Sequence, residues 1–233
     1  MNGEAALLLL ADSRLPAGGH AHSGGVEEAV RRGAVTGTGD LARFLRGRLA
    51  TAGLVTAALA AAACELAASE TAAELWRRLD AEADARAASP AQREASRTQG
   101  RLLLRTARRL WPSAVLDTLA RAVPEGPHHA VALGAAGASA GCAPRQAALT
   151  AAYTSVTGPA TAAVRLLGLD PVTVHRLLAD LAPAIEGAAS AACASPGDAA
   201  GPTGWHALPG HSAPALDLLA EGHLTNPMKL FVS

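Results

Sequence analysis

The apolar residues of this chain are mostly alanine and leucine, and this choice constrains the fold more than any other feature. Half of the 233 residues are hydrophobic, yet only 3% are aromatic. Alanine has the highest intrinsic helix propensity, whereas strand-forming residues are scarce, since Ile185 is the only isoleucine. No segment alternates valine or threonine with polar residues at the period of a strand. The sequence therefore predicts an all-α fold, a single-domain helical bundle of roughly ten helices over residues 1–233.

Several local signals place helix ends. Thr71–Glu74 and Ser89–Gln92 have the pattern of a capping box at a helix N-terminus. Gly158-Pro159 predicts a break between two helices, because proline lacks the backbone donor that a helix interior needs. The small side chains of Val131–Gly141 predict a central helix that its neighbours approach closely. Residues 195–213, rich in Gly, Pro and Ser, are expected to form a mobile loop.

Charge and cysteine content exclude several classes of protein. The formal net charge is zero and the sequence pI is about 7.1, so no basic surplus favours nucleic-acid binding. Three widely spaced cysteines, Cys64, Cys142 and Cys193, do not suggest a disulfide framework. Leu7–Leu10 is too short for a signal peptide, and Leu54–Ala63 falls short of a membrane span. We expect a cytoplasmic protein without a membrane segment.

The densest polar cluster raises the possibility of a hydrolase. It contains Asp12, Ser13, His20, His22 and Ser23. In the hydrolase alternative, Ser23 is the nucleophile and His22 the base. The segment differs from the G-x-S-x-G nucleophile motif at Ala21. That motif also needs a preceding strand, whereas the residues before it have the pattern of a helix and a turn. A polar turn between two helices is the favoured interpretation, and no catalytic residue is predicted.

Two histidine pairs raise the possibility of a nickel-binding carrier. His20 and His22 form one pair, and His128 and His129 form the other. Zinc sites use three or four protein ligands, and neither pair has the spacing of a helical metal motif. The only lysine is Lys229, so the chain has no P-loop for nucleotide. We predict no resident metal and no cofactor, with the carrier kept as an alternative.

Arginines recur at four-residue steps in the middle of the chain. Arg93, Arg97, Arg101 and Arg105 fall on one face of a predicted helix. A solvated helix face is the favoured interpretation. The alternative is an arginine stripe that meets an acidic partner.

The C-terminal residues are unusually apolar. A terminus that carries Leu230, Phe231 and Val232 is expected to fray unless something holds it. Burial of a Phe or Leu side chain contributes roughly 1.5–3 kcal/mol. The tail, residues 224–233, is therefore docked on its own domain or anchors another protein, and the pattern alone does not choose between these.

Four motifs, in order along the chain, together resemble the UreF family. The first motif resembles the family's D-S-x-L-P-x-G signature, which is followed by S-x-G-x-E. The second resembles the family's R-x-x-S-x-x-x-G helix, and the third resembles its basic-Leu motif. The last motif resembles the family's P-x-L-D…H…R-L-F-x-S ending. They lie at Leu10–Glu27, at Arg93–Gly100, at Ala163–Leu169, and at Pro214–Asp217 with His223 and Lys229–Ser233. Two positions depart from the pattern: Lys229 stands where arginine is usual, and His20 where an aromatic residue is usual.

The resemblance implies a helical homodimer that performs no chemistry itself. Members of that family join UreD (also called UreH) to the GTPase UreG, and this assembly delivers nickel into apo-urease with GTP hydrolysis. The family's UreD contact carries over to the tail residues Lys229, Leu230, Phe231 and Ser233. The basic residue of the third motif, Arg165, carries over to the surface that faces UreG, where arginine suits bidentate pairing with a carboxylate.

Overall fold

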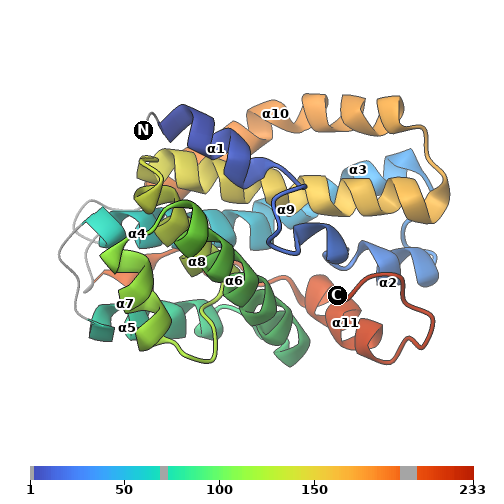
Figure 1. Ribbon diagram of the computed structural model, residues 1–233. Coiled ribbons are helices and arrows are strands. Elements are labelled where there is room, and N and C mark those ends of the chain that lie inside the picture. The colour runs from blue at the N-terminus through green and yellow to red at the C-terminus, as the bar shows by residue number, and fades with distance from the viewer. Residues whose placement is uncertain (1–2, 69–72, 195–203) are drawn as a thin grey trace.

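The computed structural model describes residues 3–68, 73–194 and 204–233, and within these ranges every regular element is a helix (Figure 1). The predicted all-α class is confirmed. The α-helices are α1 (Gly3–Ala11), α2 (Val26–Arg31), α3 (Thr38–Arg48), α4 (Leu54–Ala68), α5 (Ala73–Ala85), α6 (Pro90–Leu110), α7 (Ala114–Ala122), α8 (His129–Ser139), α9 (Pro144–Leu167), α10 (Pro171–Cys193) and α11 (Pro214–Leu224).

The helices α4, α8 and α9 form the centre of the bundle. α4 packs against both α8 and α9, while α10 and α6 cover the outer sides of α9 and α8 (Figure 1). A Cβ atom on Gly134 of α8 would lie 2.2 Å from the carbonyl oxygen of Ala60 in α4. Only glycine allows the two backbones to approach this closely. The prediction of a closely approached central helix over residues 131–141 is confirmed.

A continuous helix from Thr38 to Ala68 includes α3, a single π-helical turn at Leu49–Gly53, and α4. This helix is long and apolar enough to cross a membrane, which the shorter stretch Leu54–Ala63 did not suggest. However, 67% of its most apolar window is buried inside the protein, where α8, α9 and α10 pack around α4. Such burial is typical of the core helix of a packed domain.

The predicted break at Gly158-Pro159 is wrong, because α9 runs without interruption through Pro159. Proline has no N–H to donate to the carbonyl of the residue four positions earlier, Ser155. Arg48 replaces it: its Nε–H donates to the Ser155 oxygen at 2.8 Å, and its Nη1–H donates to the Gly24 oxygen at 2.9 Å. Burial lowers the pKa of the Arg48 guanidinium to about 10. A side chain from α3 therefore satisfies the helix that proline would otherwise end.

The prediction of a solvated arginine face is wrong for the first half of α6. Arg97 is mostly buried and donates to Asp80 at 2.8 Å and to Asp84 at 3.0 Å, both in α5. Arg93 donates to the carbonyl oxygen of Ala87 at 2.7 Å. The acidic partner of this part of the stripe is in the same chain, so these arginines join α5 to α6.

The cap and loop predictions have different outcomes. The Ser89 side chain accepts the Gln92 N–H at 3.1 Å and confirms the start of α6. The other capping box begins at Thr71, which lies outside the described residues, as does most of the predicted loop, residues 195–203. In residues 204–213, Trp205 is buried and Arg86 donates to its carbonyl oxygen at 2.9 Å. Mobility of this loop stays a prediction.

Candidate functional site

The tail returns from α11 to the turn between α1 and α2. The N–H of Val232 donates to the Ala21 oxygen at 2.7 Å, and the N–H of Ser23 donates to the Ser233 oxygen at 2.5 Å. Figure 1 accordingly places the C-terminus beside α2 and α11. Backbone hydrogen bonds therefore join two of the sequence motifs, which are separated by some two hundred residues of chain.

A buried carboxylate holds the backbone of the tail. Glu27 in α2 accepts the N–H of Leu230 at 2.6 Å and the N–H of Phe231 at 3.2 Å. His223 in α11 lies beside it, with Nε2 3.2 Å from the Phe231 oxygen and Nδ1 3.6 Å from a Glu27 oxygen. Hydrogen bonds to a charged acceptor are about twice as strong as neutral ones. The tail is thus fixed through its backbone, so its side chains can point either into the protein or toward solvent.

The side chains of the tail alternate between the interior and the surface. Phe231 is only 5% exposed, and the guanidinium of Arg165 in α9 lies over its ring, 5.1 Å from the centroid. Leu230 is 69% exposed, and Lys229 and Met228 are exposed as well. The tail therefore docks on its own domain and at the same time presents apolar side chains outward. The structure brings Arg165, Phe231 and Ser233 into one region, while Lys229 and Leu230 face away from it.

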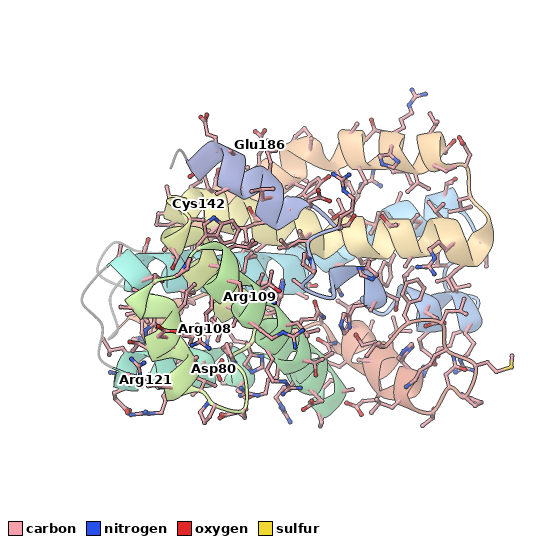
Figure 2. The ribbon with its side chains drawn as sticks, viewed as in Figure 1. Asp80, Arg108, Arg109, Arg121, Cys142 and Glu186 are labelled. Carbon is pink, nitrogen blue, oxygen red and sulfur yellow. The ribbon has the colours of Figure 1, made fainter. Side chains whose placement is uncertain are left out.

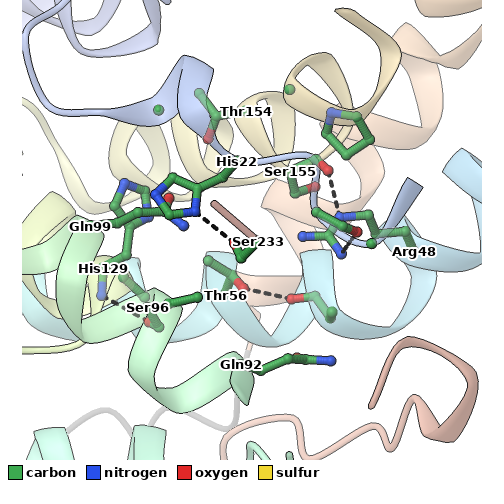
Figure 3. Close-up of a pocket in the computed structure, with 18 of the residues that line it drawn as sticks. His22, Arg48, Thr56, Gln92, Ser96, Gln99, His129, Thr154, Ser155 and Ser233 are labelled. Atoms are coloured by element: carbon green, nitrogen blue, oxygen red, sulfur yellow. Dashed lines mark hydrogen bonds between the residues drawn. The ribbon is translucent and has the colours of Figure 1, made fainter. Parts of the chain in front are cut away.

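A cavity of about 1200 Å³ lies behind the docked tail (Figure 3). Its walls come from the turn before α2 and from α4, α6, α8, α9, α11 and the tail. Seven of the eight histidines of the chain line it: His20, His22, His128, His129, His175, His211 and His223. Sequence reasoning grouped the histidines only by adjacency and missed this convergence, since helix packing alone brings them together.

Two of these imidazoles stay neutral at physiological pH. Burial lowers the pKa of His22 to about 4, and the neighbouring His20 and His223 add to the shift. Burial, with repulsion from His22, lowers the pKa of His129 to about 4 as well. The His22 Nδ1 lies 2.6 Å from the Ser233 Oγ (Figure 3). Among the described residues, no three histidine, cysteine or carboxylate side chains group as ligands for a metal ion.

The geometry does not pair Ser23 with a base. The Ser23 side chain is fully buried at the start of α2, where its Oγ accepts the Glu27 N–H at 3.5 Å. His22 faces Ser233 instead, and no strand precedes the turn in the described chain. The hydrolase alternative therefore lacks the contact between nucleophile and base that it requires.

A serine, a histidine and an aspartate do meet elsewhere, in contacts that sequence reasoning missed. His128 places Nδ1 3.1 Å from the Ser96 Oγ and Nε2 2.8 Å from an Asp84 oxygen. The same Ser96 Oγ accepts the N–H of His129 at 3.1 Å, and Asp80 accepts the N–H of His128 at 2.7 Å. Since α8 has no side-chain cap of its own, these side chains from α5 and α6 cap it from outside. Their arrangement is accounted for by the start of a buried helix.

Gly100, the glycine of the R-x-x-S-x-x-x-G motif, lies where α6 crosses the loop before α8. A Cβ atom on Gly100 would lie 1.9 Å from the Pro127 oxygen, so the loop before α8 leaves no space for a side chain. Ser96 and Gly100 therefore make the joint between α6 and α8.

The chain is similar in sequence to known proteins over its whole length. The UreF family model matches residues 35–182. The chain is 48% identical over 227 residues to the urease accessory protein UreF of Mycobacterium sp. (strain JLS), with 97% of each chain covered. It is 47% identical to the UreF of Mycolicibacterium vanbaalenii and 44% identical to that of Mycobacterium tuberculosis (strain H37Rv), with both chains covered in full. The chain belongs to the UreF family. Its relatives thus extend over the first turn and the tail, which lie outside the segment that the UreF model matches.

Proposed function

We propose that this UreF-family chain is a urease accessory protein that acts as a non-catalytic adaptor in the cytoplasm. In this role a homodimer joins UreD (UreH) to the GTPase UreG and so promotes GTP-dependent nickel insertion into apo-urease. The curated relatives bear the name of urease accessory proteins. The observation that carries the proposal is the tail, which is docked by its backbone and displays apolar side chains to solvent.

The tail is the proposed contact for UreD. Met228, Leu230 and Val232 are 85%, 69% and 57% exposed, so they form an apolar edge that no described part of the chain covers. Because Glu27 already fixes the backbone, a partner would not have to order the tail when it binds. Rigid presentation lowers the entropic cost of association and so favours affinity. Lys229 is exposed between Met228 and Leu230, and Ser233 is partly exposed after Val232; both belong to the proposed contact.

Arg165 is the proposed contribution to the surface that faces UreG. Its guanidinium lies 5.1 Å from the centroid of the buried Phe231 ring, and because Arg165 is exposed its donors remain available to a partner carboxylate. The same contact ties Arg165 to the tail. We therefore expect occupation of the tail by UreD to alter the affinity of the Arg165 surface for UreG.

Co-purification with UreD and UreG, followed by sizing of the complex, tests the adaptor. Deletion of Met228–Ser233 and Leu230→Asp should each abolish UreD binding with helicity unchanged, and Arg165→Ala should weaken recruitment of UreG. Val172→Asp is the matched control, since Val172 is 76% exposed at the start of α10 and an acidic residue is tolerated there. Normal co-purification of the tail variants would refute the UreD contact, and normal urease activation by Arg165→Ala would refute the UreG contact.

A nickel-contacting carrier is the second candidate, because His22 and His129 keep neutral rings in one cavity. Neutral imidazole is a ligand for nickel ions, here as cargo. Equilibrium dialysis of the purified chain against nickel discriminates the two candidates. The adaptor predicts at most weak binding by the chain alone. The carrier predicts stoichiometric binding that His22→Ala and His129→Ala each remove.

A further inference from the structure

The outer face of the second half of α6 carries three exposed arginines, two of which make no ion pair with the rest of the described chain. Arg105, Arg108 and Arg109 are exposed, and Figure 2 shows Arg108 and Arg109 on the same side of the molecule as Arg121 of α7. Arg108 pairs with Asp117 of α7 at 2.7 Å. Arg105 and Arg109 make no ion pair or hydrogen bond with the rest of the described chain. We call Arg105, Arg108, Arg109 and Arg121 the α6 arginine patch.

The patch differs from the arginines of the first half of α6. Arg97 there pairs with two carboxylates, whereas in the described chain Asp117 is the only carboxylate that forms an ion pair with the four arginines of the patch. Arg105 and Arg109 are one helical turn apart, so their charges repel each other. Exposed arginines with few carboxylates between them are typical of a protein interface, where arginine is enriched and carboxylates of the partner supply the opposite charge.

We propose that the α6 arginine patch docks an acidic surface of UreG, as a second contact of that partner in addition to the Arg165 surface. The inference rests on the proposed function and adds a second surface to it. A nucleic acid is not the expected occupant, since the chain has no net positive charge to attract a phosphate backbone.

The patch and the tail lie at opposite ends of α6. Glu221 of α11 accepts the Ser89 hydroxyl at 2.6 Å, which places α11, the helix that leads into the tail, beside the start of α6. Arg105 lies sixteen residues further along the helix, a rise of about 24 Å. Two partners can therefore occupy the tail and the patch together.

The experiment measures the affinity of UreG for the purified complex of the full chain with UreD. In the test variant, Arg105→Glu and Arg109→Glu are combined. The control combines Arg46→Glu with Arg176→Glu, two exposed arginines that likewise make no ion pair in the described chain. We expect the test variant to keep UreD, to retain its helical circular dichroism, and to bind UreG at least about tenfold more weakly, because charge reversal at close pairs is costly. Its residual binding should also depend less on salt than that of the wild type.

The outcomes separate this inference from the proposed function. Unchanged UreG affinity in the test variant overturns the patch while the adaptor role stands. An equal loss in the control overturns it as well, since the effect would then follow from net charge. Loss of UreD from the test variant alone would show that patch and tail are not separate surfaces and also overturns it. Failure of the wild-type chain to bind UreD or UreG contradicts the proposed function itself.

Discussion

Phe231→Ala tests how the tail is held. The ring is buried and packs beneath Arg165, while the N–H groups of residues 230 and 231 donate to Glu27 and that of Val232 donates to Ala21. Truncation of a buried Phe costs about 3–5 kcal/mol. Since each 1.4 kcal/mol is a factor of ten, the undocked tail should become more populated by a factor of about 100 or more. The helices should keep their stability, because the loss is confined to the docked segment.

Hydrogen exchange of the three tail amides, at positions 230, 231 and 232, measures this directly. Their protection should fall about 100-fold in Phe231→Ala, whereas the amides of α4 should not change. Leu230→Ala is the matched control, because its side chain is exposed and its backbone bond to Glu27 remains. The reasoning fails if Phe231→Ala leaves the three amides protected, or if Leu230→Ala exposes them equally. In the expected case, Leu230→Asp lowers UreD affinity with the tail still docked, whereas Phe231→Ala lowers it by releasing the tail.

Three further predictions follow from buried contacts. Gly100→Ala should lower the free energy of unfolding by at least the roughly 1–3 kcal/mol that is typical of overpacking, because the added Cβ atom would clash with the Pro127 oxygen. Thermal unfolding measures this loss. Arg48→Ala should leave two carbonyl oxygens unpaired, at about 1–3 kcal/mol each, and urea unfolding measures the loss. The pKa values of His22 and His129 are lowered from 6.5 to about 4, so the unfolded chain binds more protons between these values and stability should fall as pH drops through that window. A combined His22→Gln and His129→Gln variant should show a flatter pH profile in urea unfolding.

Patterns that depend on neighbouring residues could be read from the sequence, and contacts between distant residues could not. Helix propensity, the cap at Ser89 and the small residues around Gly134 are local, and each was confirmed. The error at Pro159 arose because the missing hydrogen bond is replaced by Arg48, whose sequence separation from Ser155 is 107 residues. The solvated interpretation of Arg97 failed for the same reason, since its carboxylates lie on another helix. Local rules predict what an isolated helix would do, and tertiary contacts override them.

The motifs that identify the family are best explained as joints between helices. Glu27 of the first motif holds the backbone of the last, and Ser96 of the second caps α8, which carries no cap of its own. A catalytic site needs a free nucleophile or an open coordination position on a metal, whereas these side chains accept hydrogen bonds from the backbone of the same chain. Such joints, together with outward apolar and cationic side chains, fit the proposed adaptor, because an adaptor holds its partners in a fixed geometry. The contacts proposed for partners lie at Leu230, which is exposed, and at the α6 arginine patch, where the side chains of Arg105 and Arg109 make no ion pair in the described chain.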